Sequence, residues 1–165
     1  MLYESVWLLD MRDAEALPTM GSLELALAAA RDACAASAAS RGVGIEIADI
    51  QSIQIGLDTD RLTLVLVNLI DNAVKHGRPG GGVFVTVDAS DRRMARVIVD
   101  DDGPGIADAD SQRVFALGKR ASTTADGSGI GLALVRLLVE RAGGRVDVSA
   151  SPLGGARFVI TMSQL

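Results

Sequence analysis

Apolar residues recur every three or four positions over residues 22–41 and again over residues 58–76, which predicts two long amphipathic helices. Ser22 is the expected N-cap of the first helix, and Gly42 and Gly44 lie where it should end. One face of each helix should be buried. The expected buried positions are Leu23, Leu27, Ala30 and Cys34 or Ala35 in the first helix, and Leu62, Val65, Leu66, Leu69, Ile70 and Ala73 in the second.

Other segments alternate between apolar and polar residues, which predicts strands with one buried face. We expect them in three pairs, 43–50 with 53–58, 83–90 with 92–100, and 145–150 with 156–162. The middle pair is a hairpin that turns near Ser90 and Asp91, and its second strand leads directly to Asp101.

Residues 1–20 differ from the rest of the chain. They contain the only tryptophan, Trp7, and the helix-breaking residue Pro18, and Gly21 follows them directly. Two interpretations stay open, a short helix and linker that packs on the domain, or the frayed end of a helix that belongs to an upstream domain. We expect residues 21–165 to form the folded domain.

Composition narrows the class of protein. The 165 residues fit a single domain, and 48% hydrophobic with only 3% aromatic residues predicts an aliphatic core. The chain has 16 Lys plus Arg against 21 Asp plus Glu, without a basic run, which argues against nucleic-acid binding. The single cysteine excludes an internal disulfide. With no long apolar run and no signal peptide, we expect a cytoplasmic location.

The first candidate for chemistry is the segment 97–106, VIVDDDGPGI, where a strand runs into acidic residues and glycines. Gly103 and Gly105 lack a Cβ, so a flat ligand could approach the backbone closely. Ionised Asp101 only accepts hydrogen bonds, so it would select a ligand with an N–H donor, such as an exocyclic amine. Asp-Gly-Pro-Gly is also an ordinary turn sequence.

A second candidate is a polar face on the helix 58–76, for which Asp58 or Thr59 is the expected cap. Its members are Asn68, Asp71, Asn72 and Lys75. Their spacing places them on one side of the helix. This side is either solvated or faces a ligand. In the second case an amide oxygen could bind Mg²⁺, and Lys75 could contact phosphate.

The third candidate is the glycine-rich start of a helix at 127–144. Free N–H groups at Gly127, Gly129 and Gly131 would favour an anion. The preceding segment, 107–127, is polar apart from the apolar island 114–117, which is typical of a binding loop or lid. Lys119 and Arg120 in this segment either contact an anionic ligand or are solvated.

Together these segments resemble the catalytic ATP-binding domain of sensor histidine kinases, within the superfamily of gyrase, Hsp90, histidine kinases and MutL. The resemblance covers about residues 22–165. NLIDNAVKH (68–76) resembles the N box, DDGPGI (101–106) the G1 box, Phe115 the F box, and GSGIGLALV (127–135) the G2 box. It implies an α+β two-layer sandwich, with a mixed, mostly antiparallel sheet of about five strands and three main helices on one face.

The resemblance also implies roles for individual residues, with ATP and Mg²⁺ as ligands. Asn68 would hold Mg²⁺, Asn72 and Lys75 would contact phosphates, and Asp101 would bind the adenine amine. Lys119 or Arg120 would reach the γ-phosphate from the lid. The remaining expected pocket residues are His76, Gly103, Gly105, Ile106, Gly127, Ser128, Gly129, Ile130, Gly131 and Leu132.

His76 is the single histidine of the chain, and at this position the family carries a pocket residue, not a phosphoacceptor. The resemblance therefore implies a domain that transfers the γ-phosphate of Mg-ATP to a histidine on a separate dimerisation domain, and does not phosphorylate itself in isolation. The implied partners are that dimerisation domain of the same kinase and, downstream, a response regulator. We expect the isolated domain to be monomeric and its full-length parent to be anchored in a membrane.

Two alternatives remain. An anti-sigma-factor-type serine kinase shares the fold, but Phe115 and the length of the lid argue against it. A non-catalytic nucleotide-binding module is disfavoured by the intact Asn68, Asp101 and glycines. Related ATPases place Glu at position 68 to activate water, whereas an amide cannot accept a proton near neutral pH, so Asn68 favours transfer to a protein.

Overall fold

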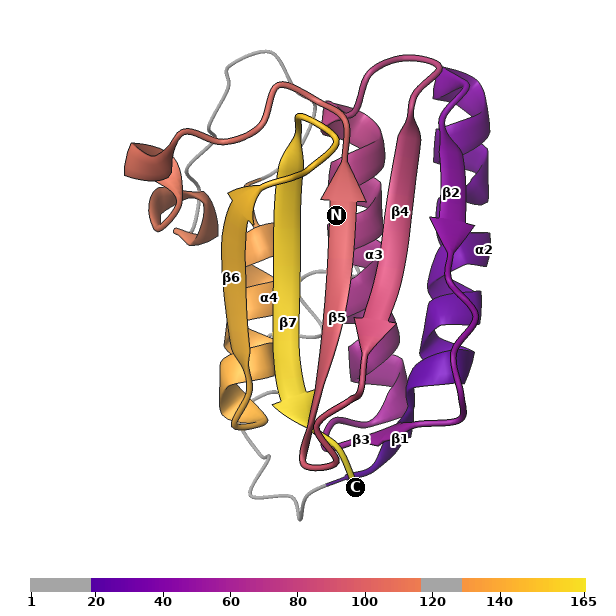
Figure 1. Cartoon of the computed structure of the whole chain (residues 1–165), viewed down its shortest axis with the longest axis vertical. Coiled ribbons are helices and arrows are strands. Elements are labelled where there is room, and N and C mark those ends of the chain that lie inside the picture. Colours follow the sequence, from indigo (N-terminus) through magenta and orange to yellow (C-terminus); the bar gives the residue numbers. More distant parts are fainter. Residues whose placement is uncertain (1–18, 117–128) are drawn as a thin grey trace.

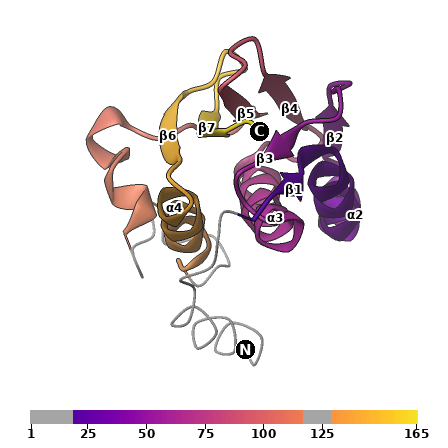
Figure 2. The same ribbon diagram turned by 90° about the horizontal axis from the view of Figure 1, so that it is seen from below.

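The computed structural model describes residues 19–116 and 129–165, in which a five-stranded sheet is covered by α-helices on one face (Figure 1). In chain order the elements are β1 (Gly21–Ser22), α2 (Leu23–Arg41), β2 (Gly44–Ile47), β3 (Gln54–Ile55), α3 (Thr59–His76), β4 (Gly82–Asp88), β5 (Met94–Asp101), the 3₁₀ turns η1 (Asp108–Asp110) and η2 (Arg113–Phe115), α4 (Gly131–Arg141), β6 (Arg145–Ala150) and β7 (Ala156–Ser163). Seen from below, α2, α3 and α4 lie together on one side of the sheet (Figure 2). This arrangement confirms the expected α+β sandwich.

The strands of the main sheet follow the order β2-β4-β5-β7-β6. β2 is parallel to β4, and the other pairs are antiparallel. The predicted hairpin of β4 with β5 and the closing pair of β6 with β7 are both confirmed. β5 lies in the middle of the sheet. Its last residue, Asp101, pairs with Val83 of β4, and its side chain accepts the N–H of Ala156, the first residue of β7.

The predicted pairing of 43–50 with 53–58 is wrong. β2 instead joins the main sheet beside β4, with Gly44 opposite Gly82. β3 forms a separate two-stranded sheet with β1, and Ile55 also bridges to Gln164 near the end of the chain. Both segments are strands, but alternation identifies only the buried face of a strand and not its partner.

The caps and buried faces of the first two helices agree with the sequence. The Ser22 hydroxyl accepts a hydrogen bond from the N–H of Leu25 at 3.3 Å, and Gly42 ends α2 in the left-handed region at φ 65°. Asp58, not Thr59, caps α3, because its carboxylate accepts the N–H of Arg61 at 2.9 Å. Of the two candidates for the last buried position in the first helix, Cys34 is buried and Ala35 is exposed.

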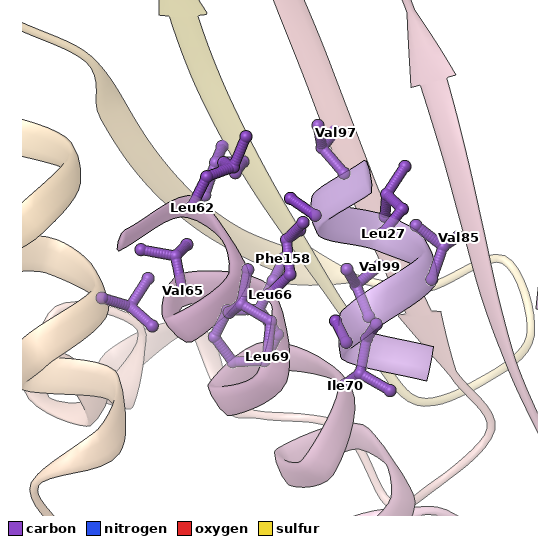
Figure 3. Close-up of a cluster of buried hydrophobic side chains, with 14 of the residues drawn as sticks. Leu27, Leu62, Val65, Leu66, Leu69, Ile70, Val85, Val97, Val99 and Phe158 are labelled. Atoms are coloured by element: carbon purple, nitrogen blue, oxygen red, sulfur yellow. The ribbon is translucent and has the colours of Figure 1, made fainter. Parts of the chain in front are cut away.

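The core lies between the sheet and the helices, with α3 at its centre (Figure 3). The labelled residues are Leu27 of α2, Leu62, Val65, Leu66, Leu69 and Ile70 of α3, and Val85, Val97, Val99 and Phe158 of the sheet. Burying one such side chain contributes about 1.5–3 kcal/mol. Since the apolar face of α3 is fixed in this way, its polar face is also held in a defined position.

Within the described ranges, none of the helices has the length and apolar character needed to cross a bilayer.

Candidate functional site

Asp101 ends β5 with its carboxylate inside the protein, and the residue is only 2% exposed. Its Oδ1 accepts backbone N–H bonds from Gly103 at 2.9 Å and from Ala156 at 3.1 Å. Among residues 19–116 and 129–165, no hydrogen bond to Oδ2 is found. The carboxylate is thus fixed by one oxygen, and its second oxygen can accept a hydrogen bond from a ligand.

Burial raises the pKa of the Asp101 carboxyl above 3.8. The two backbone hydrogen bonds and nearby His76 lower this pKa, whereas the charge of Asp102 raises it further. Desolvation is the largest of these influences, so the charged form is held at a cost that a hydrogen-bond donor of a ligand would offset.

Glycines surround this carboxylate because side chains would not fit. A Cβ at Gly103 would overlap the carbonyl oxygen of His76, and one at Gly155 would overlap Asp101 Oδ1. Gly105 has a φ of +76°, which side chains rarely adopt. The turn after β5 therefore packs against the end of α3 on one side and the β6–β7 connection on the other.

Asn68 lies on the polar face of α3 at the point where α4 begins. Its Nδ2 donates to the Leu64 carbonyl at 2.8 Å. A Cβ at Gly131 would lie only 2.5 Å from Asn68 Oδ1. The amide oxygen is therefore oriented towards the first residue of α4, and the structure brings these two predicted site residues together.

The other predicted residues of α3 are partly or fully exposed to solvent. Asn72 is half-buried, and the His76 side chain is exposed. Lys75 Nζ lies 2.6 Å from Asp71 on the same helix, with side chains 42% and 29% exposed. Such exposed pairs contribute about 0–1 kcal/mol, so Lys75 can exchange this partner for a ligand phosphate at little cost.

The start of α4 has the features of an anion site. Ile130 is its N-cap and makes no side-chain capping bond, Gly131 is its first residue, and Gly129 has a φ of 70°. N–H groups in a first turn without a side-chain cap favour a negative ligand. Ile106 and Leu132 are partly buried against the core beside the site.

Of the expected lid segment, 107–127, the structure describes residues 107–116. Lys119, Arg120, Gly127 and Ser128 lie outside the described residues, as do residues 1–18. Within the apolar island, Val114 and Phe115 are buried. The Phe115 ring packs edge to face on the Phe158 ring, with 6.1 Å between the two centroids. The guanidinium of Arg136 lies over the Phe115 ring, 5.9 Å from its centroid.

Sequence reasoning missed two contributors to this site. One is the backbone N–H of Ala156, whose only sequence signal is the preceding pair Gly154 and Gly155. The other is Asp102, which accepts backbone N–H bonds from Arg78 and Gly82 and connects the G1 segment to the turn after α3. The sequence signal for Asp102 is the acidic triplet 100–102, in which the motif identifies a ligand-binding role for Asp101 alone.

The residues present fit a magnesium ion only in combination with ligand oxygens. Within residues 19–116 and 129–165, no cluster of three or more His, Cys, Asp or Glu could hold a metal. Mg²⁺ is commonly bound by one or two protein oxygens together with substrate phosphates and water. The amide oxygen of Asn68, oriented towards the start of α4, is a suitable donor of this kind.

Comparison with known proteins agrees with this geometry. Residues 57–164 match the family described as histidine kinase-, DNA gyrase B-, and HSP90-like ATPase. The adaptive-response sensory kinase SasA of Prochlorococcus marinus is 36% identical over 129 residues, which cover 74% of this chain and 33% of SasA.

Solved structures of sensor kinases share the fold. The mycobacterial sensor histidine kinase MprB is 25% identical, with a TM-score of 0.78 over 90% of this chain and 98% of that chain. Full-length ShkA in complex with AMPPNP is 30% identical, with a TM-score of 0.76 over 92% of this chain and 33% of that chain. The chain thus spans about a third of the length of SasA and ShkA. Because the matched family covers well over half of its residues, the chain belongs to the histidine kinase-, DNA gyrase B- and HSP90-like ATPase family.

Proposed function

We propose that this chain is the catalytic ATP-binding domain of a two-component sensor histidine kinase. It binds Mg-ATP and transfers the γ-phosphate to a histidine on a dimerisation domain of the same full-length protein. The observation that carries the proposal is that Asp101 and Asn68 both lie along α3. Asn68 is on the polar face of this helix, and the last residue of the helix, His76, lies against Gly103 in the turn that begins at Asp101. The buried carboxylate has one oxygen for an adenine amine, and the amide oxygen faces the anion-binding start of α4.

Asp101 binds and orients the base. Its Oδ1 is held by two backbone N–H groups, which keep the carboxylate from rotating. Oδ2 is therefore available to the base in a fixed orientation. A hydrogen bond from the adenine amine to this oxygen is charge-assisted and contributes about 1.5–3 kcal/mol. Gly103 and Gly105 keep the space beside the base free of side chains, while Ile106 and Leu132 supply apolar surface.

Residues of α3 and α4 hold the phosphates. Asn68 is the metal ligand, Asn72 and Lys75 contact phosphate oxygens, and the N–H groups around Gly129 and Gly131 bind the same anion from α4. Bound Mg²⁺ would supply charge neutralisation for the phosphates. From the segment 117–128, we assign Lys119 or Arg120 to the γ-phosphate, and Gly127 and Ser128 to the glycine-rich loop.

Asn68 also bears on the type of reaction. Phosphoryl transfer depends mainly on positioning and charge neutralisation, which these residues supply. No proton acceptor stands at position 68 to activate water, and the amide of Asn68 cannot take that role. The domain therefore protects ATP from hydrolysis and presents its γ-phosphate to an incoming imidazole.

His76 is a wall of the nucleotide pocket in this proposal, so the acceptor histidine must come from elsewhere. The dimerisation domain of the parent kinase supplies it, and a response regulator receives the phosphate afterwards. The isolated domain is monomeric and does not label itself. The parent kinase is anchored in a membrane with this domain on the cytoplasmic side, where ATP is available.

Two measurements test the proposal. Calorimetry with ATP, with and without Mg²⁺, should show binding that GTP does not reproduce, because guanine presents a carbonyl where adenine presents its amine. The chain is then mixed with γ-labelled ATP and candidate histidine-containing dimerisation domains. Acid-labile label should appear on the dimerisation domain, and His76→Phe should not abolish it. Absence of ATP binding, or label on His76 itself, would overturn the proposal.

A further inference from the structure

Asp102, in the turn after β5, binds the backbone of the turn that joins α3 to β4. It follows Asp101 directly, but its carboxylate is bound to a different part of the chain. Oδ1 accepts the N–H of Arg78 at 3.0 Å, and Oδ2 accepts the N–H of Gly82 at 3.2 Å. Each oxygen therefore takes one backbone donor, at the two ends of the turn that returns from α3 to β4.

The turn 77–82 is closely fitted to this carboxylate. A Cβ at Gly81 would overlap the carboxylate of Asp102, and one at Gly77 would lie 3.3 Å from Asp102 Oδ1. Gly103, the next residue along the chain, packs against the carbonyl oxygen of His76. Asp102 and Gly103 thus join the end of β5 to the last residues of α3.

The same turn is also held from its other side. Gly80 donates its N–H to the Arg41 carbonyl at 3.1 Å, and Gly81 accepts a bond from the N–H of Gly44 at 3.0 Å. These contacts reach α2 and β2 and do not involve β5. If Asp102 is changed, the turn stays attached to the domain but loses the two hydrogen bonds that fix Arg78 and Gly82 to the residue after β5. The pairing of Val83 with Asp101 and the close packing of Gly103 on His76 then remain as the connections to β5.

We propose that Asp102 is a positioning residue of the nucleotide site, which sets the distance between the end of α3 and Asp101 by holding the turn 77–82 against β5. The inference rests on the proposed function, in which one ATP molecule contacts both Asp101 and the polar face of α3. Asn72, Lys75 and His76 lie in the last two turns of α3, so a shift of this helix end would misplace them relative to the base.

Because Asp102 is charged, the direction of the change in ATP affinity distinguishes an electrostatic role from a positioning role. Removing a negative charge beside a bound polyanion would tighten binding if Asp102 acted only through electrostatics. Loss of positioning predicts weaker binding. A matched control is Asp88, at the opposite end of β4, whose carboxylate accepts two hydrogen bonds from Ser90.

The experiment compares Asp102→Ala, Asp102→Asn and Asp88→Ala with the unchanged chain by calorimetry with Mg-ATP. Because misplaced contacts bind ATP less tightly, we expect at least about a tenfold loss of affinity for Asp102→Ala, which corresponds to about 1.4 kcal/mol. Asp102→Asn keeps one acceptor oxygen, so its affinity for Mg-ATP should lie between that of Asp102→Ala and that of the unchanged chain. Asp88→Ala should bind as the unchanged chain does. Hydrogen exchange at the amides of Arg78 and Gly82 should speed up in the same order as affinity falls.

The outcomes separate this inference from the proposed function. If the unchanged chain ignores ATP, the proposed function fails. If it binds ATP through Asp101, but both Asp102 variants bind it equally well or more tightly, only the role of Asp102 is overturned. A loss in Asp88→Ala as large as in Asp102→Ala would also overturn it, because the effect would then be general destabilisation. Should Asp102→Ala not fold, Asp102→Asn decides the question.

Discussion

Asp101→Asn separates the binding role of Asp101 from its structural role. The amide oxygen of Asn can replace Oδ1 and keep the bonds from Gly103 and Ala156. The amide nitrogen then replaces Oδ2 and presents a donor to the adenine amine, which is also a donor. Binding therefore loses the charged acceptor and gains a mismatch.

The magnitude follows from this exchange. A hydrogen bond to a charged group contributes about 1.5–3 kcal/mol. Since 1.4 kcal/mol corresponds to about a tenfold change in Kd, we expect ATP affinity to fall by one to two powers of ten. The mismatch places the expected loss near the upper end of this range.

Stability should behave differently from affinity. The folded-state pKa of Asp101 is raised, mainly by burial, so ionisation of this carboxyl destabilises the free domain. Its unfavourable contribution is absent below pH 3.8, grows as the pH rises through the raised pKa, and is then constant. Asn does not ionise. Asp101→Asn should therefore be at least as stable as the unchanged chain at neutral pH, with an advantage that disappears under acidic conditions.

Calorimetry with ATP and chemical denaturation at several pH values measure both effects. Asp100→Asn is a matched control, since Asp100 is also buried but accepts two 2.8 Å bonds from Arg157 instead. That variant should lose stability because it breaks an ion pair. Unchanged ATP affinity in Asp101→Asn would refute the adenine role. Equal losses of affinity and stability would show that the charge of Asp101 serves the fold.

Three further predictions concern other parts of the molecule. Asn68→Ala should weaken Mg-ATP binding at least about tenfold but Mg-free ATP far less, and equal losses would argue against metal ligation. Gly131→Ala places a Cβ 2.5 Å from Asn68 Oδ1, so the amide of Asn68 must turn away from α4. Calorimetry should then show weaker Mg-ATP binding, whereas full affinity would contradict the proximity of the two residues. Burial raises the pKa of the Cys34 thiol from 9.0 to about 11, so a thiol reagent at pH 7.5 should label it only after denaturation, and rapid labelling of the folded chain would contradict its burial.

Local features of the fold could be predicted from the sequence because short-range chemistry determines them. The caps at Ser22 and Asp58, the left-handed Gly42 and the buried faces of α2 and α3 follow from side-chain spacing and backbone preference. The hairpin leading to Asp101 follows from alternation with a turn between. The same reasoning identified the polar face of α3 and the glycines after β5 as candidate chemistry.

Only the tertiary structure decided which distant segments meet. The segment 53–58 pairs with β1 and not with its predicted neighbour, because the choice of partner depends on how whole elements pack. Asn68 meets Gly131, and Asp102 holds the turn at Arg78 and Gly82, through contacts between residues at least 20 positions apart. Sequence periodicity reports which side of an element is buried, while the free energy that selects its partner comes from packing the complete core, and that information is not local.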